Sequence, residues 1–115
     1  MPAPIVFVDF ASPDTQVLAN FYSSVFGWDV DEDGKFEVSV LPTIQGAIRE
    51  DPVEKRIYVG VPDVAAHLSL IEKEGGTVEV PRFEVSGVVV LGLFKDPAGN
   101  PMGLVEMDGD KPLIP

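Results

Sequence analysis

One pattern occurs twice in this sequence, and it restricts the fold more than any other feature. Asp14 follows a short apolar run and a proline, and the helix-like stretch after it ends at Gly27. Asp63 and Gly76 repeat this arrangement 49 residues further along the chain. The equal spacing of strand, helix start and glycine indicates two structurally related halves. The cleft between such halves is a natural place for a ligand.

The first half is predicted to have the order β-α-β-β-β. Residues Ile5–Phe10 are β-branched and aromatic, which is typical of a short buried strand. Ser12 can cap the helix that follows, and its apolar residues form one stripe: Val17, Leu18, Phe21, Tyr22, Val25 and Phe26. Three further strands are predicted, separated by a turn at Asp33-Gly34 and a break at Pro42-Thr43: Trp28–Val30, Phe36–Leu41 and Ile44–Arg49.

The second half repeats this order after an acidic, proline-containing linker at residues 50–54. Asp63 caps a helix whose apolar stripe is Val64, Leu68 and Ile71. The predicted strands are Arg56–Val61, Thr77–Val80, Val85–Phe94 with a break at Gly87, and Pro101–Met107. We expect one domain over residues 1–115, with module one at 4–50 and module two at 55–107. The tail, 108–115, is expected to be loose or packed on a partner.

The charge balance limits the classes of partner. Asp and Glu number 19 against 8 Lys and Arg, which gives a formal net charge of −11. Such a surface repels phosphate backbones, so we expect no nucleic-acid binding. The charge serves solubility or attracts a cationic small molecule. Without cysteine, a basic N-terminal region or a long apolar run, the chain is expected to be cytoplasmic and not membrane-bound.

Several segments together resemble the vicinal oxygen chelate superfamily, which includes glyoxalase I, bleomycin-resistance proteins and extradiol dioxygenases. The resemblance rests on four segments in the family's order: residues 20–28 (NFYSSVFGW), 61–64 (VPDV), 74–76 (EGG) and 96–106 (DPAGNPMGLVE). It implies an α+β fold of two βαβββ modules, forming a curved, half-open mixed sheet with the helices outside. It also implies a homodimer. Members include isomerases, lyases, dioxygenases, transferases and plain binding proteins, so the fold does not fix the function.

In metal-dependent members, each half supplies two ligands, one on its first strand and one on its last. The resemblance places Phe7 and Arg56 at the first-strand positions, and Arg49 and Glu106 at the last-strand positions. Phenylalanine and guanidinium groups offer no lone pair to a metal ion, so we expect no metal and no cofactor. The only histidine, His67, is expected at the boundary of the second helix and not as a ligand.

The resemblance implies that Phe7, Arg49, Arg56 and Glu106 converge in the cleft. One interpretation is structural, with Glu106 paired to an arginine. The other is functional, with an arginine left to bind a carboxylate or phosphate-like group of a ligand. Aromatic and apolar strand residues are either walls of this site or core: Phe36, Tyr58, Phe83, Phe94 and Met102.

The favoured hypothesis is therefore a metal-free glyoxalase- or bleomycin-resistance-like protein that binds an unidentified small molecule between its modules. Phe7, Arg49, Arg56, Glu106, Tyr58, Phe94 and Met102 are its candidate binding residues. One alternative is a metal-dependent lyase or isomerase whose ligands lie elsewhere. Another is a non-catalytic interaction module. The sequence leaves open whether the protein is an enzyme.

Overall fold

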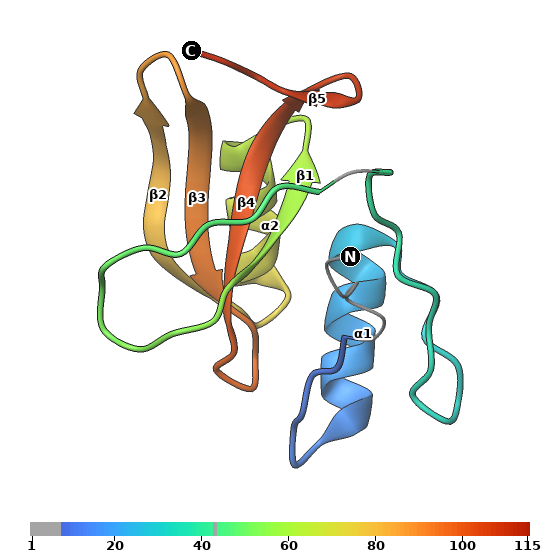
Figure 1. Cartoon of the computed structure of the whole chain (residues 1–115). Helices are drawn as coiled ribbons and strands as arrows, with labels where there is room; N and C mark the ends of the chain where they lie inside the picture. Colours follow the sequence, from blue (N-terminus) through green and yellow to red (C-terminus); the bar gives the residue numbers. More distant parts are fainter. Residues whose placement is uncertain (1–7, 43) are drawn as a thin grey trace, which may run out of the picture.

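A computed structural model describes residues 8–42 and 44–115 of the chain (Figure 1). Its elements are α1 (Thr15–Phe26), β1 (Ile57–Val61), α2 (Val64–Lys73), β2 (Thr77–Val85), β3 (Val89–Lys95), β4 (Pro101–Asp108) and β5 (Lys111–Pro112). The main strands follow the order β1-β4-β3-β2, and β5 pairs with β4. The β1–β4 pair is parallel and the other pairs are antiparallel. The predicted class, α+β with an open mixed sheet and helices outside it, is confirmed.

The repeated aspartates cap the two helices in the same way. The Asp14 carboxylate accepts a hydrogen bond from the Val17 N–H (3.1 Å), and the Asp63 carboxylate accepts one from the Ala66 N–H (2.9 Å). Each bond satisfies a backbone donor that the first helical turn leaves without a partner. The 49-residue interval between Asp14 and Asp63 therefore corresponds to two equivalent helix starts.

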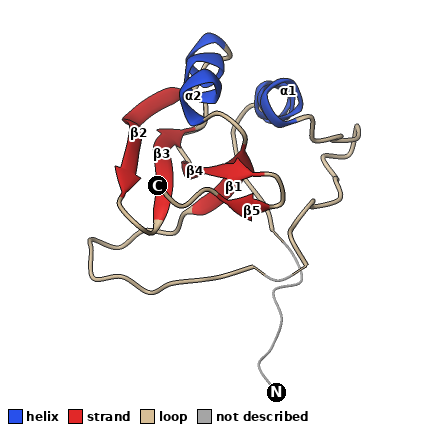
Figure 2. Ribbon diagram, turned by 90° about the horizontal axis from the view of Figure 1, so that it is seen from above, coloured by secondary structure: helices blue, strands red, loops and turns tan. Residues whose placement is uncertain are grey.

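The hydrophobic core lies between the sheet and the two helices. Figure 2 shows α1 and α2 on the same side of the sheet. Alternate residues of β3 and β4 point toward the helices, because successive side chains of a strand face opposite sides. The core consists of Leu18, Phe21, Tyr22, Val25, Val61, Val64, Leu68, Ile71, Phe94, Met102 and Leu104. One face of the sheet is therefore covered by the helices, and the opposite face is open.

The second half has the predicted β-α-β-β-β order. The strand β2 runs on to Val85, beyond the predicted end at Val80, and pairs with β3 through two register shifts. Gly87 has a φ of 75° in the turn between them, which confirms the predicted break. The expectation of a loose tail is wrong, and its packing on a partner stays a prediction. The tail forms β5 against β4, and the Gly87 N–H donates to the Pro115 carbonyl (2.9 Å).

The strands predicted for the first half are absent from the described residues. Residues 8–10, 28–30, 36–41 and 44–49 have no strand partner, and residues 5–7 of the first predicted strand lie outside the described part. The predicted turn does form, since the Gly34 N–H donates to the Asp31 carbonyl (3.0 Å). A strand needs a neighbour for its backbone groups, and an alternating pattern does not supply one. The interpretation of these segments as strands is therefore wrong for the isolated chain.

The described part of the chain contains no helix with the length and apolar character that a membrane crossing requires.

Candidate functional site: the open face of the sheet

The face of the sheet turned away from the helices, here called the open face, carries a row of paired residues. Tyr58, Gly103 and Leu93 are register partners across β1, β4 and β3. The segment before β1 crosses this face (Figure 1). Together they border an open cavity of about 410 Å³ lined by Tyr58, Leu91, Leu93, Arg49, Glu54 and Arg56, among others. The cavity therefore has an apolar floor and a charged rim.

Tyr58 lies directly over Gly103. A Cβ atom at Gly103 would stand 2.4 Å from the Tyr58 ring, closer than two carbon atoms can approach. The glycine thus allows the ring to lie flat against β4. The Tyr58 side chain remains partly exposed, at 44% of its full surface. An aromatic surface that is both supported from below and open to solvent can stack with a ligand.

Arg56 is held at the end of this row by four hydrogen bonds. It donates to the Met102 carbonyl (2.6 Å), to Glu79 (3.0 Å) and to both carboxylate oxygens of Glu54 (2.8 and 3.2 Å). Only 6% of its side chain is exposed. Burial lowers the pKa of Arg56, but its bonds to Glu54 and Glu79 outweigh this and raise the pKa. The guanidinium group is therefore charged, and each of its three nitrogens donates at least one hydrogen bond.

Arg49 belongs to the same ionic network. Its guanidinium group binds Asp51 (2.5 Å) and Glu54, so Glu54 bridges Arg49 and Arg56. The hydrogen bond from Arg56, joined by that from Arg49, lowers the pKa of Glu54. The side chain of Arg49 is 47% exposed. The structure thus brings together two of the predicted site residues, Arg49 and Arg56. The guanidinium groups of both are bonded to carboxylates of the same chain.

Glu106 lies on the other face of the sheet, at the start of α2. Its Oε1 accepts from the Val64 N–H (3.0 Å) and from Arg82 Nε (3.2 Å), and its Oε2 accepts from Arg82 Nη2 (2.8 Å). The hydrogen bond from Arg82, followed by that from Val64, lowers the pKa of Glu106. Glu106 thus pairs with an arginine, as the structural interpretation expected, but the partner is Arg82, which sequence reasoning did not consider.

The period of β4 already indicated which face Glu106 occupies. Met102, Leu104 and Glu106 alternate with Gly103, so an apolar stripe that faces the core continues into Glu106. The resemblance to the family implies the cleft for Glu106, and this alternation along β4 contradicts it. Gly103 is the residue of β4 that faces the cavity beside Tyr58.

The remaining candidate residues have different surroundings. Phe94 and Met102 are buried in the core at 0% and 1% exposure, and neither lines the open-face cavity. Phe83 is half-buried and paired with Leu91. His67 lies beside α1, where its ring stacks on Phe26 at 6.2 Å between centroids. Phe7 lies outside the described residues.

The described residues do not fit a metal ion of the superfamily's type. Within residues 8–42 and 44–115, no three His, Asp or Glu side chains are grouped closely enough to hold a metal. Arg56 occupies one implied ligand position and donates hydrogen bonds where a metal would need a lone pair. The carboxylate of Glu106 is bound to Arg82 on the opposite face.

Comparison with known proteins places this geometry in context. Residues 5–105 match the family described as the glyoxalase-like domain. The chain is 26% identical over 113 residues to CFP32 of Mycobacterium bovis and of Mycobacterium tuberculosis, whose name describes it as a candidate glyoxylase. The match covers 85% of this chain but 43% of each relative, so the chain spans less than half the length of these proteins.

Solved structures share the fold at low sequence identity. A glyoxalase-related enzyme from Fulvimarina pelagi superposes with a TM-score of 0.68 at 16% identity, covering 90% of this chain and 88% of that one. A glyoxalase/bleomycin resistance protein/dioxygenase family enzyme from Burkholderia phytofirmans gives a TM-score of 0.67 at 13% identity, covering 86% and 94%. The family match over most of the sequence and the shared fold lead to one conclusion: the chain belongs to the glyoxalase-like domain family, within the vicinal oxygen chelate superfamily.

Proposed function

We propose that the protein binds a small organic molecule on the open face of its sheet, without a bound metal ion. The observation that carries this proposal is the Tyr58 ring, supported by Gly103 and exposed to a cavity of about 410 Å³. A volume of this size falls in the range typical of small-molecule sites. Leu91 and Leu93 extend the apolar floor, so the ligand is expected to present a flat or apolar group to the sheet.

The charges around the cavity argue against an anion as the ligand. Arg49 and Arg56 are each bonded to carboxylates, and Asp51, Glu54 and Glu79 together outnumber them. An anionic ligand would have to displace a carboxylate that is already in place, at a cost in free energy. A neutral or cationic ligand meets no such cost. The net charge of −11 also favours attraction of a cation.

The donor chemistry supports the metal-free part of the proposal. The described positions that the superfamily uses for ligands carry arginines or a carboxylate engaged elsewhere. Guanidinium groups repel a divalent cation. Elemental analysis of the purified protein tests this directly. A stoichiometric transition metal that leaves on chelation, together with loss of ligand binding, would contradict it.

A homodimer is part of the same proposal. Several large apolar side chains between residues 38 and 53 are exposed: Val38, Val40, Leu41, Ile44, Ile48 and Val53. In the described part of the chain, β1 and β2 each have one outer edge without a strand partner. Exposed apolar segments and open strand edges are typical of surfaces that a second copy covers. Light scattering after size-exclusion chromatography should give twice the mass of one chain.

Catalysis is the second candidate function, because relatives and structural neighbours bear names of glyoxalase-type enzymes. A lyase or isomerase would need a group that can exchange a proton with its substrate, whereas Glu54 beside the open-face cavity is bonded to Arg49 and Arg56. An assay of purified protein with candidate 2-oxoaldehyde substrates, with and without added divalent metals, separates the two functions. Metal-dependent turnover would favour the enzyme.

The binding proposal is tested by thermal unfolding with a panel of neutral, cationic and anionic aromatic compounds. We expect a compound that raises the melting temperature of the native protein to lose this effect in Tyr58→Ala. Val88→Ala is the matched control, since Val88 is exposed in the turn between β2 and β3 and does not line the cavity. Full retention of the shift in Tyr58→Ala would refute the proposed site.

A further inference from the structure

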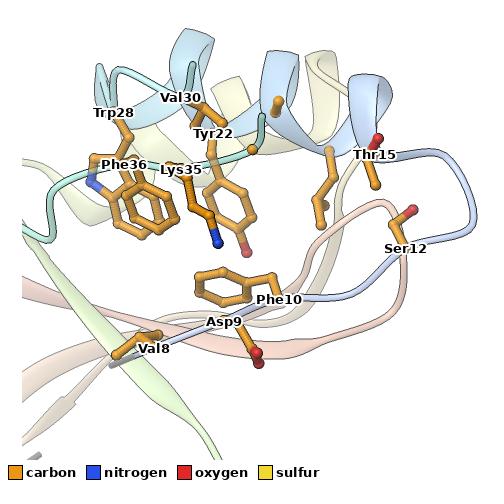
Figure 3. A pocket seen from close by; sticks show the side chains of 13 residues that line it. Val8, Asp9, Phe10, Ser12, Thr15, Tyr22, Trp28, Val30, Lys35 and Phe36 are labelled. Atoms are coloured by element: carbon orange, nitrogen blue, oxygen red, sulfur yellow. The ribbon is translucent and has the colours of Figure 1, made fainter. Parts of the chain in front are cut away.

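A second cavity lies against α1, away from the open face. It has a volume of about 250 Å³ and shares no lining residue with the open-face cavity. Its walls come from residues 8–12, from α1 and from the turn region of residues 28–36 (Figure 3). Neither the family match nor the proposed function assigns a role to it.

Three aromatic rings form a continuous stack along one wall. Trp28 lies between Tyr22 and Phe36, with centroid distances of 4.9 and 5.4 Å and interplanar angles of 13° and 12°. Phe10 packs beside the stack, 5.1 Å from Tyr22. Figure 3 shows these rings with Trp28 and Phe36 at one end and the hydroxyl groups of Ser12 and Thr15 at the other. The cavity therefore has an aromatic end and a polar end.

The stack is held in place from the buried side. Tyr22 is 3% exposed, and its hydroxyl group donates to Asp96 Oδ2 (2.9 Å). Asp96 in turn accepts from the backbone N–H groups of Ala98 and Asn100 and from the Asn100 side chain. Burial, with the nearby Asp96 carboxylate, raises the pKa of Tyr22, so its phenol stays neutral. The stack is thus fixed before any ligand arrives, which lowers the cost of binding.

Trp28 and Phe36, in contrast, are only half-buried. The stack therefore ends at the cavity with aromatic surface that the described residues do not cover fully. Among the described residues that line the cavity, Asp9 and Lys35 are the charged ones, and their charges are opposite. A neutral ligand is favoured, because neither sign of charge is in excess around it.

We propose that this cavity is a second binding site, selective for a neutral planar aromatic compound of one or two fused rings that carries a hydroxyl group. The rings pack against Phe36 and the edge of Trp28, since the two faces of Trp28 are covered by Tyr22 and Phe36. The hydroxyl group reaches the polar end near Thr15 and Ser12, whose Oγ also donates to the Asp14 carbonyl (3.0 Å) and accepts from the Asp14 N–H (3.1 Å). Fused rings of this size fit a cavity of about 250 Å³. The site goes beyond the proposed function and does not depend on it.

The sequence provides its own reporter, because Trp28 is the only tryptophan. Its indole N–H gives a single resonance in a proton–nitrogen correlation spectrum. We would titrate 2-naphthol into the intact protein and compare it with decahydro-2-naphthol, which has the same carbon skeleton without the aromatic rings. We expect a saturable shift of the Trp28 resonance with 2-naphthol and much weaker binding of the saturated compound.

Substitutions in the two cavities show which of them binds 2-naphthol. Phe36→Leu should weaken 2-naphthol binding by about 2- to 12-fold, the value of one aromatic pair, and Phe36→Tyr should restore it. Tyr58→Ala, on the open face, should leave the titration unchanged, so this test and that of the proposed function fail independently. The proposal is overturned if the Trp28 resonance shows no saturable shift, if both compounds bind equally, or if Tyr58→Ala abolishes the shift. The comparison of the two compounds uses the native protein, so it holds even if Phe36→Leu does not fold.

Discussion

Replacing Glu106 with glutamine tests whether this carboxylate joins β4 to the start of α2. The substitution keeps the size of the side chain and removes its charge. The bond from the Val64 N–H, 3.0 Å long, then goes to a neutral acceptor. The buried end of α2 also loses the negative charge that its dipole favours. We therefore expect Glu106→Gln to fold but to unfold more easily.

The magnitude follows from these two contributions. A hydrogen bond to a charged group contributes about 1.5–3 kcal/mol and a neutral one about 0.5–1.5 kcal/mol, so about 1 kcal/mol is lost at Val64. Loss of the charge at the helix start adds about 0.3–1 kcal/mol. Arg82 is 35% exposed, so solvent screens its pairing and we add nothing for it. The sum, about 1–2 kcal/mol, corresponds to a fall in melting temperature of roughly 4–8 °C.

The assay is thermal unfolding followed by circular dichroism at pH 7, with Glu84→Gln as the control. Glu84 also faces Arg82, at 3.6 Å, but half of its side chain is exposed, so its loss should change little. If Glu106→Gln unfolds at the native temperature, or no earlier than Glu84→Gln, then Glu106 does not stabilise α2. Ligand binding on the open face should survive the substitution, since Glu106 lies on the other face.

The same carboxylate predicts a dependence on pH. Its pKa in the folded protein is lower than its ordinary value of about 4.3, so the unfolded chain binds the proton more tightly. Its contribution to stability is thus fully present above that value and is lost as the pH falls through the folded pKa. The stability difference between native protein and Glu106→Gln should therefore shrink below about pH 4. A difference that stays constant down to pH 2 would contradict this assignment.

Three further substitutions have defined outcomes. Gly103→Ala should displace the ring of Tyr58, lower the free energy of unfolding in urea by about 1–3 kcal/mol and abolish open-face binding. Gly46→Ala is the control, because a Cβ atom there meets no other atom, and it should change stability by less than about 0.5 kcal/mol. Tyr22→Phe removes the buried donor to Asp96 and should cost about 1–3 kcal/mol, measured in the same way. Phe94→Ala should cost about 3–5 kcal/mol, as for a core residue, and a stable variant that loses only ligand binding would show that Phe94 belongs to a site.

The second half of the fold could be predicted because its signals are local. An aspartate cap, an apolar helical stripe and alternation in the strands act within a few residues of each other, and all agree there. The first half carries similar signals, yet residues 36–49 form no ladder among the described residues. Alternation shows that a strand would have an apolar face, but it does not show that a neighbouring strand exists to pair with it.

The candidate site was harder to predict because its residues depend on which face of the sheet each side chain occupies. Tyr58 lies on β1 and Arg56 directly precedes that strand, so simple alternation predicts that the two side chains share a face. The family's spacing predicts that Glu106 faces the cleft, whereas the alternation along β4 puts it on the face of Met102 and Leu104, where it bonds to the Val64 N–H. Arg82 could not be recognised as its partner, because β2 reaches this position only through irregular pairing with β3.

The two helices differ in the hydrogen bonds that join them to the rest of the protein. The start of α2 receives a carboxylate from Asp63 and a second one from Glu106 on β4, so helix and sheet are linked directly. The start of α1 is capped by the Asp14 carboxylate, and the bond that ties this helix to the second half runs from the Tyr22 hydroxyl to Asp96. The helix otherwise packs through apolar side chains such as Leu18 and Val25, and the aromatic cavity lies beside it.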